Sequence, residues 1–208
     1  MSDPALHVLH AVRLSGLASE GAVATATGLP EADVAELMAT LTDSGLVKRR
    51  TGRMPGYSLT AEGRSHHAER VAGTLPDGAR PDLERGYHAF LPLNAAFKQL
   101  CTDWQLRPGQ AGEQVPNDHT DAAYDGAIVT RLGQLHAEIA GVLDGAATAL
   151  PRFESYPRRF ASALARLRAG EGSALARPLS DSYHDVWMQL HEDFLLSLGR
   201  SREEADGC

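Results

Sequence analysis

Residues 41–63 read LTDSGLVKRRTGRMPGYSLTAEG, and this stretch decides the fold. Gly45 follows an apolar-periodic segment and is typical of the left-handed cap that ends a helix. Residues 46–50 have the composition of a short strand, and residues 51–56 form a turn rich in glycine and proline. Residues 57–59 alternate as a returning strand, and Thr60 stands at the N-cap of a further helix. The stretch therefore predicts the end of one helix, a hairpin and the start of another helix.

Upstream of this stretch, the sequence predicts three short helices. The first is a short amphipathic helix with Asp3 as its cap. The second is a helix of small residues over 21–27, which follows Ser19. A tight turn at 28–30 precedes the third helix, residues 31–44. Its apolar residues recur at i, i+3, i+4 and i+7, which places them on one buried face; they are Val34, Leu37, Met38 and Leu41.

This order of elements resembles the winged helix-turn-helix domain of MarR-like and related bacterial regulators. The resemblance lies in residues 23–29, 41–47 and 57–64, and it covers about residues 5–72. It implies that helix 31–44 enters the major groove of DNA and that the hairpin is a wing on the phosphate backbone. Four positive charges fall within six residues of this wing, at Lys48, Arg49, Arg50 and Arg53. Phosphate neutralisation by such residues releases counterions and supplies most non-specific affinity.

The predicted recognition helix has the opposite charge. Its outward positions include Glu36, Thr40 and Asp43 and contain no basic residue. Glu36 is a candidate acceptor for a cytosine amino group, and Thr40 is a candidate contact for a thymine methyl. Acids near phosphates oppose DNA binding, so a second hypothesis stays open, in which the winged helix binds another protein.

Composition and charge narrow the class of protein. The chain has 208 residues, is 43% hydrophobic and carries a net charge of −7, which is ordinary for a globular protein. Residues 1–75 contain seven basic residues against eight acids, so most of the negative charge belongs to residues 76–208. No apolar run approaches the ~20 residues of a membrane span, and the N-terminus does not resemble a signal peptide. Two cysteines provide no disulfide framework, which fits a reducing cytoplasm.

The rest of the chain reads as helices alone. A segment with two prolines and a glycine, residues 74–81, predicts a linker between a domain of residues 1–75 and a domain of residues 76–208. Apolar periodicity predicts four helices and no strand, with residues 108–117 as a polar loop; the helices span 83–105 (interrupted at Pro92), 121–150, 153–169 and 181–198. The predicted fold class is mainly α, a winged helix-turn-helix with a small β-hairpin followed by an all-helical, bundle-like domain.

Histidines beside acids and aromatic residues mark a candidate ligand site in the second domain. The candidates share helical segments that can face a bundle core, where inward histidines can hold a metal or cofactor; they are His119, His136, Tyr183, His184, Trp187 and His191. Structural histidines and core packing explain the same pattern. The region is also similar to an accessory module of actinobacterial pyruvate, phosphate dikinase-like proteins, through residues 90–94, 117–119 and 181–187, which implies a regulatory rather than a catalytic part.

Together, these features favour a cytoplasmic, DNA-binding transcriptional regulator of bacterial type. We predict double-stranded DNA and a second copy of the chain as partners, with a small-molecule effector in the helical domain. We predict no enzyme activity, bound metal, cofactor or membrane association. Two alternatives stay open: a helical-bundle metal- or cofactor-binding enzyme with a vestigial winged helix, and a protein-interaction accessory module.

Overall fold

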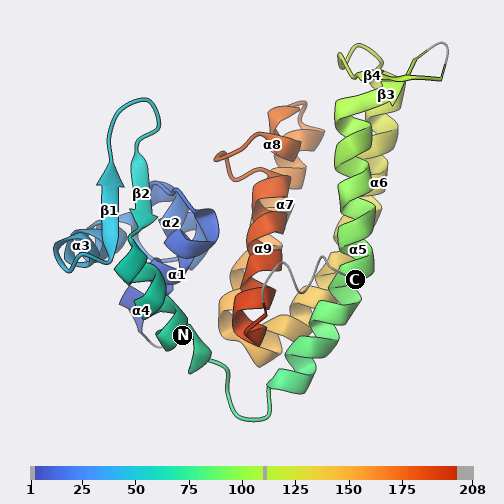
Figure 1. Cartoon of the computed structure of the whole chain (residues 1–208). Helices are drawn as coiled ribbons and strands as arrows, with labels where there is room; N and C mark the ends of the chain where they lie inside the picture. The colour runs from blue at the N-terminus through green and yellow to red at the C-terminus, as the bar shows by residue number, and fades with distance from the viewer. Residues whose placement is uncertain (1–2, 110–111, 201–208) are drawn as a thin grey trace.

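The computed structural model describes residues 3–109 and 112–200, and the fold is mainly helical (Figure 1). Its N-terminal part consists of helices that surround one antiparallel hairpin. The elements are α1 (Pro4–Ser15), α2 (Glu20–Thr27), α3 (Glu31–Asp43), β1 (Val47–Arg50), β2 (Gly56–Leu59) and α4 (Ala61–Ala72). This order agrees with the helix, hairpin and helix sequence predicted from residues 41–63.

Side-chain caps explain where these helices begin. Asp3 accepts hydrogen bonds from the backbone N–H groups of Ala5 and Leu6, at 3.0 and 3.3 Å. Ser19 caps α2, and Thr60 caps α4 by accepting from Gly63 N at 2.9 Å. Each cap satisfies a helix N–H that has no partner within its own helix. The predictions of Asp3 and Thr60 as caps are confirmed, and Ser19 is a further cap.

The junction between the hairpin and α4 explains the glycine at 63. A Cβ atom placed on Gly63 would lie only 1.9 Å from the carbonyl oxygen of Leu46. The same oxygen accepts a hydrogen bond from Thr60 N at 3.0 Å. Only glycine lets the first turn of α4 approach the start of the hairpin this closely.

The C-terminal part packs long helices around α9. Two antiparallel helices, α5 and α6, form one wall, and α7 and α9 lie between that wall and the N-terminal part (Figure 1). The elements are α5 (Arg80–Gln105), β3 (Leu106–Pro108), β4 (Gln114–Pro116), α6 (Ala122–Ala149), the 3-10 helix η1 (Pro151–Glu154), α7 (Ser155–Arg168), α8 (Ser173–Ala176) and α9 (Tyr183–Leu198).

Two sequence predictions for this part are wrong. Residues 108–117 do not form a loop in an all-helical domain, because β3 and β4 pair antiparallel, with Arg107 opposite Val115. This three-residue pairing is too short to leave an alternating pattern. Helix α5 passes through Pro92 without interruption, since the neighbouring turns hold the helix despite the missing N–H. Helix α6 is capped by Asp121, whose side chain accepts from the backbone N–H groups of Ala123 and Tyr124.

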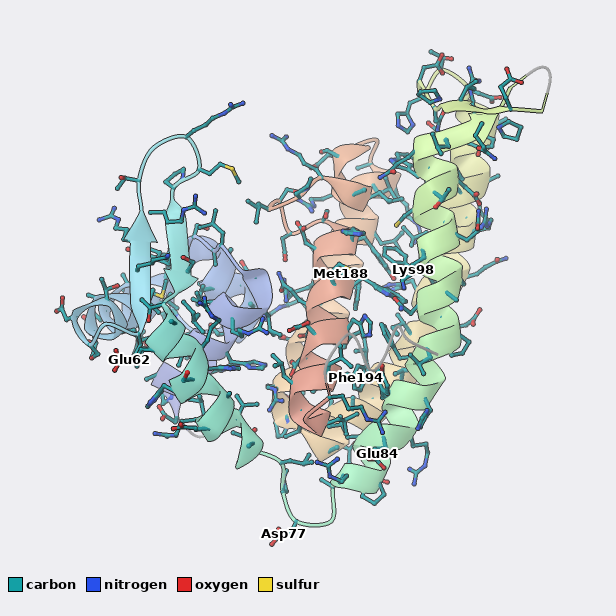
Figure 2. The ribbon with its side chains drawn as sticks, in the orientation of Figure 1. Glu62, Asp77, Glu84, Lys98, Met188 and Phe194 are labelled. Carbon is teal, nitrogen blue, oxygen red and sulfur yellow. The ribbon has the colours of Figure 1, made fainter. Side chains whose placement is uncertain are left out.

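Two separate clusters of buried apolar residues lie on either side of the segment 73–79. One is formed within residues 8–59, and the other within residues 83–198. Phe194 points from α9 into the second cluster (Figure 2), where its ring packs against Tyr87, Phe90 and Phe153. Asp77 marks the tip of the connection between α4 and α5 (Figure 2). Each part therefore has its own apolar core.

Polar contacts join the two parts. Arg13 of α1 donates to Glu192 of α9 at 2.8 Å, and Gln189 of α9 donates to Ser15 Oγ at 3.3 Å. Arg158 of α7 donates to the carbonyl oxygen of Thr25 in α2 at 3.3 Å. The helices α1 and α2 thus rest against α9 and α7, and α3 lies on the side away from the long helices (Figure 1).

Candidate nucleic-acid interface

The β1–β2 hairpin presents an exposed row of positive charge. Lys48, Arg49 and Arg50 follow the buried Val47 on β1 and are all exposed, as is Arg53 in the turn. Arg49 pairs with Tyr57 across the hairpin, and its guanidinium lies 5.9 Å from the centre of that ring. Within residues 3–109 and 112–200, Lys48, Arg50 and Arg53 make no salt bridge. Their charge is therefore available to a partner.

Tyr57 joins the hairpin to the connection between α1 and α2 and to the first residue of α2. Its backbone exchanges two hydrogen bonds with Ala18, at 2.8 and 3.0 Å, and its hydroxyl donates to Glu20 at 2.7 Å. The hydrogen bond to Glu20 raises the pKa of Tyr57, and burial raises it further to a smaller extent. These bonds orient the hairpin relative to α1 and α2, so that its basic residues point away from the core.

Helix α3 presents an acidic and neutral surface beside this hairpin. Val34, Met38 and Leu41 are buried as expected, but Leu37, predicted on the same face, is only half-buried. Glu36 and Thr40 are exposed. The Thr40 hydroxyl donates to the carbonyl oxygen of Glu36 at 3.0 Å, which leaves its methyl group as the outward contact. The other exposed carboxylates of the helix are Glu31, Asp33 and Asp43. A basic hairpin and an acidic helix therefore lie next to each other.

His119 lies apart from the other candidate ligand residues of the C-terminal part, which gather along α9. His119 precedes α6 and stacks on Trp104, with ring centres 4.5 Å apart. His136 of α6 lies 3.3 Å from the hydroxyl of Tyr183. Burial, together with the charge of Arg168, lowers the pKa of His136. Tyr183 is fully buried, and burial raises its pKa.

The remaining three candidates of α9 belong to an aromatic core. Trp187 stacks on Phe97 at 4.4 Å and donates to Asn94 Oδ1 at 2.9 Å. His184 lies beside the same Phe97 ring, while His191 packs against Phe90. No group of three or more His, Cys, Asp or Glu residues in the described ranges could hold a metal ion. The histidines of the enzyme hypothesis thus lack the arrangement of a metal site.

A buried polar network at the junction of the two parts was not predicted from the sequence. His67 Nε2 of α4 lies 2.8 Å from His10 Nδ1 of α1, and His10 Nε2 lies 3.1 Å from Asp193 Oδ1 of α9. Arg152 Nε also donates to Asp193 Oδ1, at 2.9 Å, and Tyr156 donates to Oδ2 at 3.0 Å. All five side chains are buried, so this carboxylate links elements from both parts of the chain.

Electrostatics inside the network follow from burial and from the Arg152 charge. Burial alone would raise the pKa of Asp193, but Arg152 and His10 outweigh it and hold this pKa well below its ordinary value. Burial, with the charges of His10 and nearby arginines, lowers the pKa of His67 to about 3. Asp193 is therefore ionised and His67 neutral near pH 7. The HEDF stretch that contains Asp193 has the composition of a solvated helix face, and no local pattern reveals that it meets His10 and His67.

No family model, curated protein or solved structure matches this chain. In the parts of the chain that the structure describes, no helix has the length and apolar character needed to cross a membrane. Function is therefore inferred from the residues and their geometry.

Proposed function

We propose that residues 1–75 form a winged helix-turn-helix that binds double-stranded DNA, and that the protein is a transcriptional regulator. The observation that carries the proposal is the exposed row of Lys48, Arg49, Arg50 and Arg53 on a hairpin that follows α2 and α3. In this proposal, the hairpin contacts phosphates and α3 faces the major groove. Glu36 and Thr40 are the candidate base contacts.

The helical part completes the proposed regulator. One winged-helix module buries too little DNA surface for tight specific binding, so we propose that the protein acts as a homodimer. Residues 76–208 would supply the dimer contact and the effector site. Sedimentation of the full chain at micromolar concentration tests this point, and a species of one chain's mass at all concentrations would contradict it.

DNA binding is tested by fluorescence anisotropy with a labelled duplex of about 30 base pairs, at salt concentrations between about 50 and 200 mM. We expect affinity to fall steeply with salt, and the slope of log K against log salt to shrink by about 0.9 for each phosphate that is no longer neutralised. The test variant replaces Arg49, Arg50 and Arg53 with alanine. It should weaken binding to every sequence and reduce the slope.

A second triple variant controls for net charge. It replaces Arg85, Arg131 and Arg168 with alanine; all three are exposed on the helices of the C-terminal part. The net charge falls by the same three units as in the test variant. It should bind DNA with the affinity and slope of the unmodified protein. Absence of any salt-sensitive complex, or equally weakened binding in both triple variants, would refute binding through the hairpin.

The acidic face of α3 favours a second candidate function, in which the N-terminal part binds a basic protein surface. Glu36→Gln separates the two candidates. If α3 lies in the groove, removing this charge near phosphates changes DNA affinity, and the change differs between duplexes that contain or lack cytosine at the contacted position. If Glu36→Gln leaves binding to every duplex unaltered, α3 lies outside the DNA interface and is available to another protein.

A further inference from the structure

A cavity of about 590 Å³ lies at the far end of the long helices, where α5 ends, α6 begins and α7 turns into α8. Its volume is in the range of small-molecule sites. Apolar walls come from Trp104, Val129 and Leu167. Small residues of the turn after α7 line the rest of the cavity, and Gly172 faces the Trp104 ring.

One wall of this cavity carries a histidine that is held by a chain of hydrogen bonds. His119 Nδ1 lies 3.0 Å from Asp125 Oδ2, and Asn117 donates to Asp125 Oδ1 at 2.8 Å. Asn117 is buried and also donates to the carbonyl oxygen of Trp104 at 3.1 Å. Both oxygens of Asp125 therefore have a hydrogen-bond partner within this group of residues. The remaining ring nitrogen of His119, Nε2, has no hydrogen-bond partner among the described residues.

The backbone at His119 is held in an unfavourable conformation. Its φ is +59°, in the left-handed region that costs most side chains about 1–2 kcal/mol. Asn117 Oδ1 accepts from His119 N at 3.2 Å, and the Trp104 ring supports the imidazole. Strained residues persist where the surrounding structure fixes them, and they concentrate at functional sites. The strain here places the imidazole at the cavity wall.

Arg177 supplies positive charge at the same cavity. It is exposed after α8, lines the cavity, and makes no salt bridge to any residue of the described ranges. Arg177 is therefore the positive charge that the cavity offers to a ligand, and His119 Nε2 is a second polar group on the same wall. A carboxylate suits this pair of groups, because arginine binds it through paired N–H donors. An imidazole that carries protons on both nitrogens donates to the ligand from Nε2 while Nδ1 donates to Asp125.

We propose that this cavity binds a small carboxylate with an apolar body, which would pack on Val129 and Leu167 while its carboxylate binds Arg177 and His119. The inference rests on the proposed function in one respect, since it names the effector site of the proposed regulator. Its test involves no DNA, so failure of DNA binding and failure of this site are observed separately. Of the candidate ligand residues in the sequence, only His119 takes part.

The test uses the two tryptophans of the chain as reporters. In a ¹H–¹⁵N spectrum of the full protein, each indole N–H gives one signal, which Trp104→Phe assigns. We expect 2-naphthoate to shift the Trp104 signal saturably while the signal of Trp187, which is fully buried in the core, stays in place. Arg177→Ala and His119→Gln should each weaken this binding about tenfold, the size of one hydrogen bond to a charged group.

A control variant and a neutral analogue of the ligand separate specific from non-specific binding. Arg85→Ala removes the same charge from an exposed site away from the cavity and should leave 2-naphthoate affinity unchanged. The neutral analogue 2-naphthylmethanol should bind about tenfold more weakly or worse, because it offers no charge to Arg177. The proposal is overturned if 2-naphthoate gives no saturable shift of Trp104 at millimolar concentration, if the alcohol binds equally well, or if Arg177→Ala and Arg85→Ala behave alike.

Discussion

His67→Gln should remove a large part of the acid sensitivity of this protein. His67 is 1% exposed, and its folded pKa of about 3 lies far below the ordinary 6.5. Between these two values the unfolded chain binds a proton that the folded chain refuses. The stability that neutral His67 contributes is therefore complete above about pH 6.5, and it declines as pH falls from 6.5 toward 3.

The magnitude follows from the width of this window. At about pH 5, the unfolded histidine is protonated and the folded one is not, which lowers the free energy of unfolding by about 2 kcal/mol relative to pH 7.5. Glutamine keeps an amide within reach of His10 Nδ1 but cannot titrate. The free energy of unfolding of His67→Gln should thus fall by about 2 kcal/mol less than that of the unmodified protein over this pH interval.

Urea unfolding followed by circular dichroism at about pH 7.5 and pH 5 measures this difference. His66→Gln is the matched control, because His66 is the preceding residue of α4 and takes no part in the network. It should keep the pH dependence of the unmodified protein. If the fall between the two pH values is as large in His67→Gln as in His66→Gln, burial of His67 at the junction is not the cause.

Three further substitutions test packing. Asp193→Asn leaves the buried Arg152 without its carboxylate, so the free energy of unfolding measured in urea should fall by about 3–5 kcal/mol. A fall of less than about 1 kcal/mol would contradict the network. Gly63→Ala places a methyl group against Leu46 O and should lower the free energy of unfolding by about 2–3 kcal/mol. An unchanged Tm in a thermal melt would disprove this clash. Gly141→Ala in α6 meets open space and should raise the free energy of unfolding by about 0.5–1 kcal/mol, whereas a decrease would show a hidden clash.

The local elements of the N-terminal part could be predicted because each leaves a local signal. Asp3 and Thr60 have the chemistry of caps, Gly45 ends α3 with a φ of +74°, and Val34, Met38 and Leu41 lie at helical spacing. Such signals depend on residues within one or two turns. The exposed basic hairpin was predicted for the same reason, since three of its charges are consecutive on β1 and the fourth, Arg53, lies in the adjoining turn.

The cavity and the junction could not be predicted because their residues come from distant parts of the chain. Trp104, His119 and Arg177 meet only when the ends of α5, α6 and α8 are brought together. His119 and Asp125 are visible as neighbours in sequence, yet nothing local shows that Arg177 joins them. The β3–β4 pair was missed because three residues per strand are too few for an alternating pattern, and helix α5 continues through Pro92 because packing outweighs one missing hydrogen bond.

The polar character of the junction has a consequence for the proposed regulator. Two domains that meet through an apolar interface can adopt many relative positions, because hydrophobic contact has no preferred direction. Asp193 is instead held by Arg152 at 2.9 Å within the C-terminal part and meets His10 of the N-terminal part at 3.1 Å, so this contact between the parts is directional. A buried ion pair contributes little net stability compared with well-packed apolar residues, so its effect here is to fix geometry. We infer that the network sets the angle at which the long helices carry the basic hairpin, and that in a dimer it would set the spacing of two such hairpins on DNA.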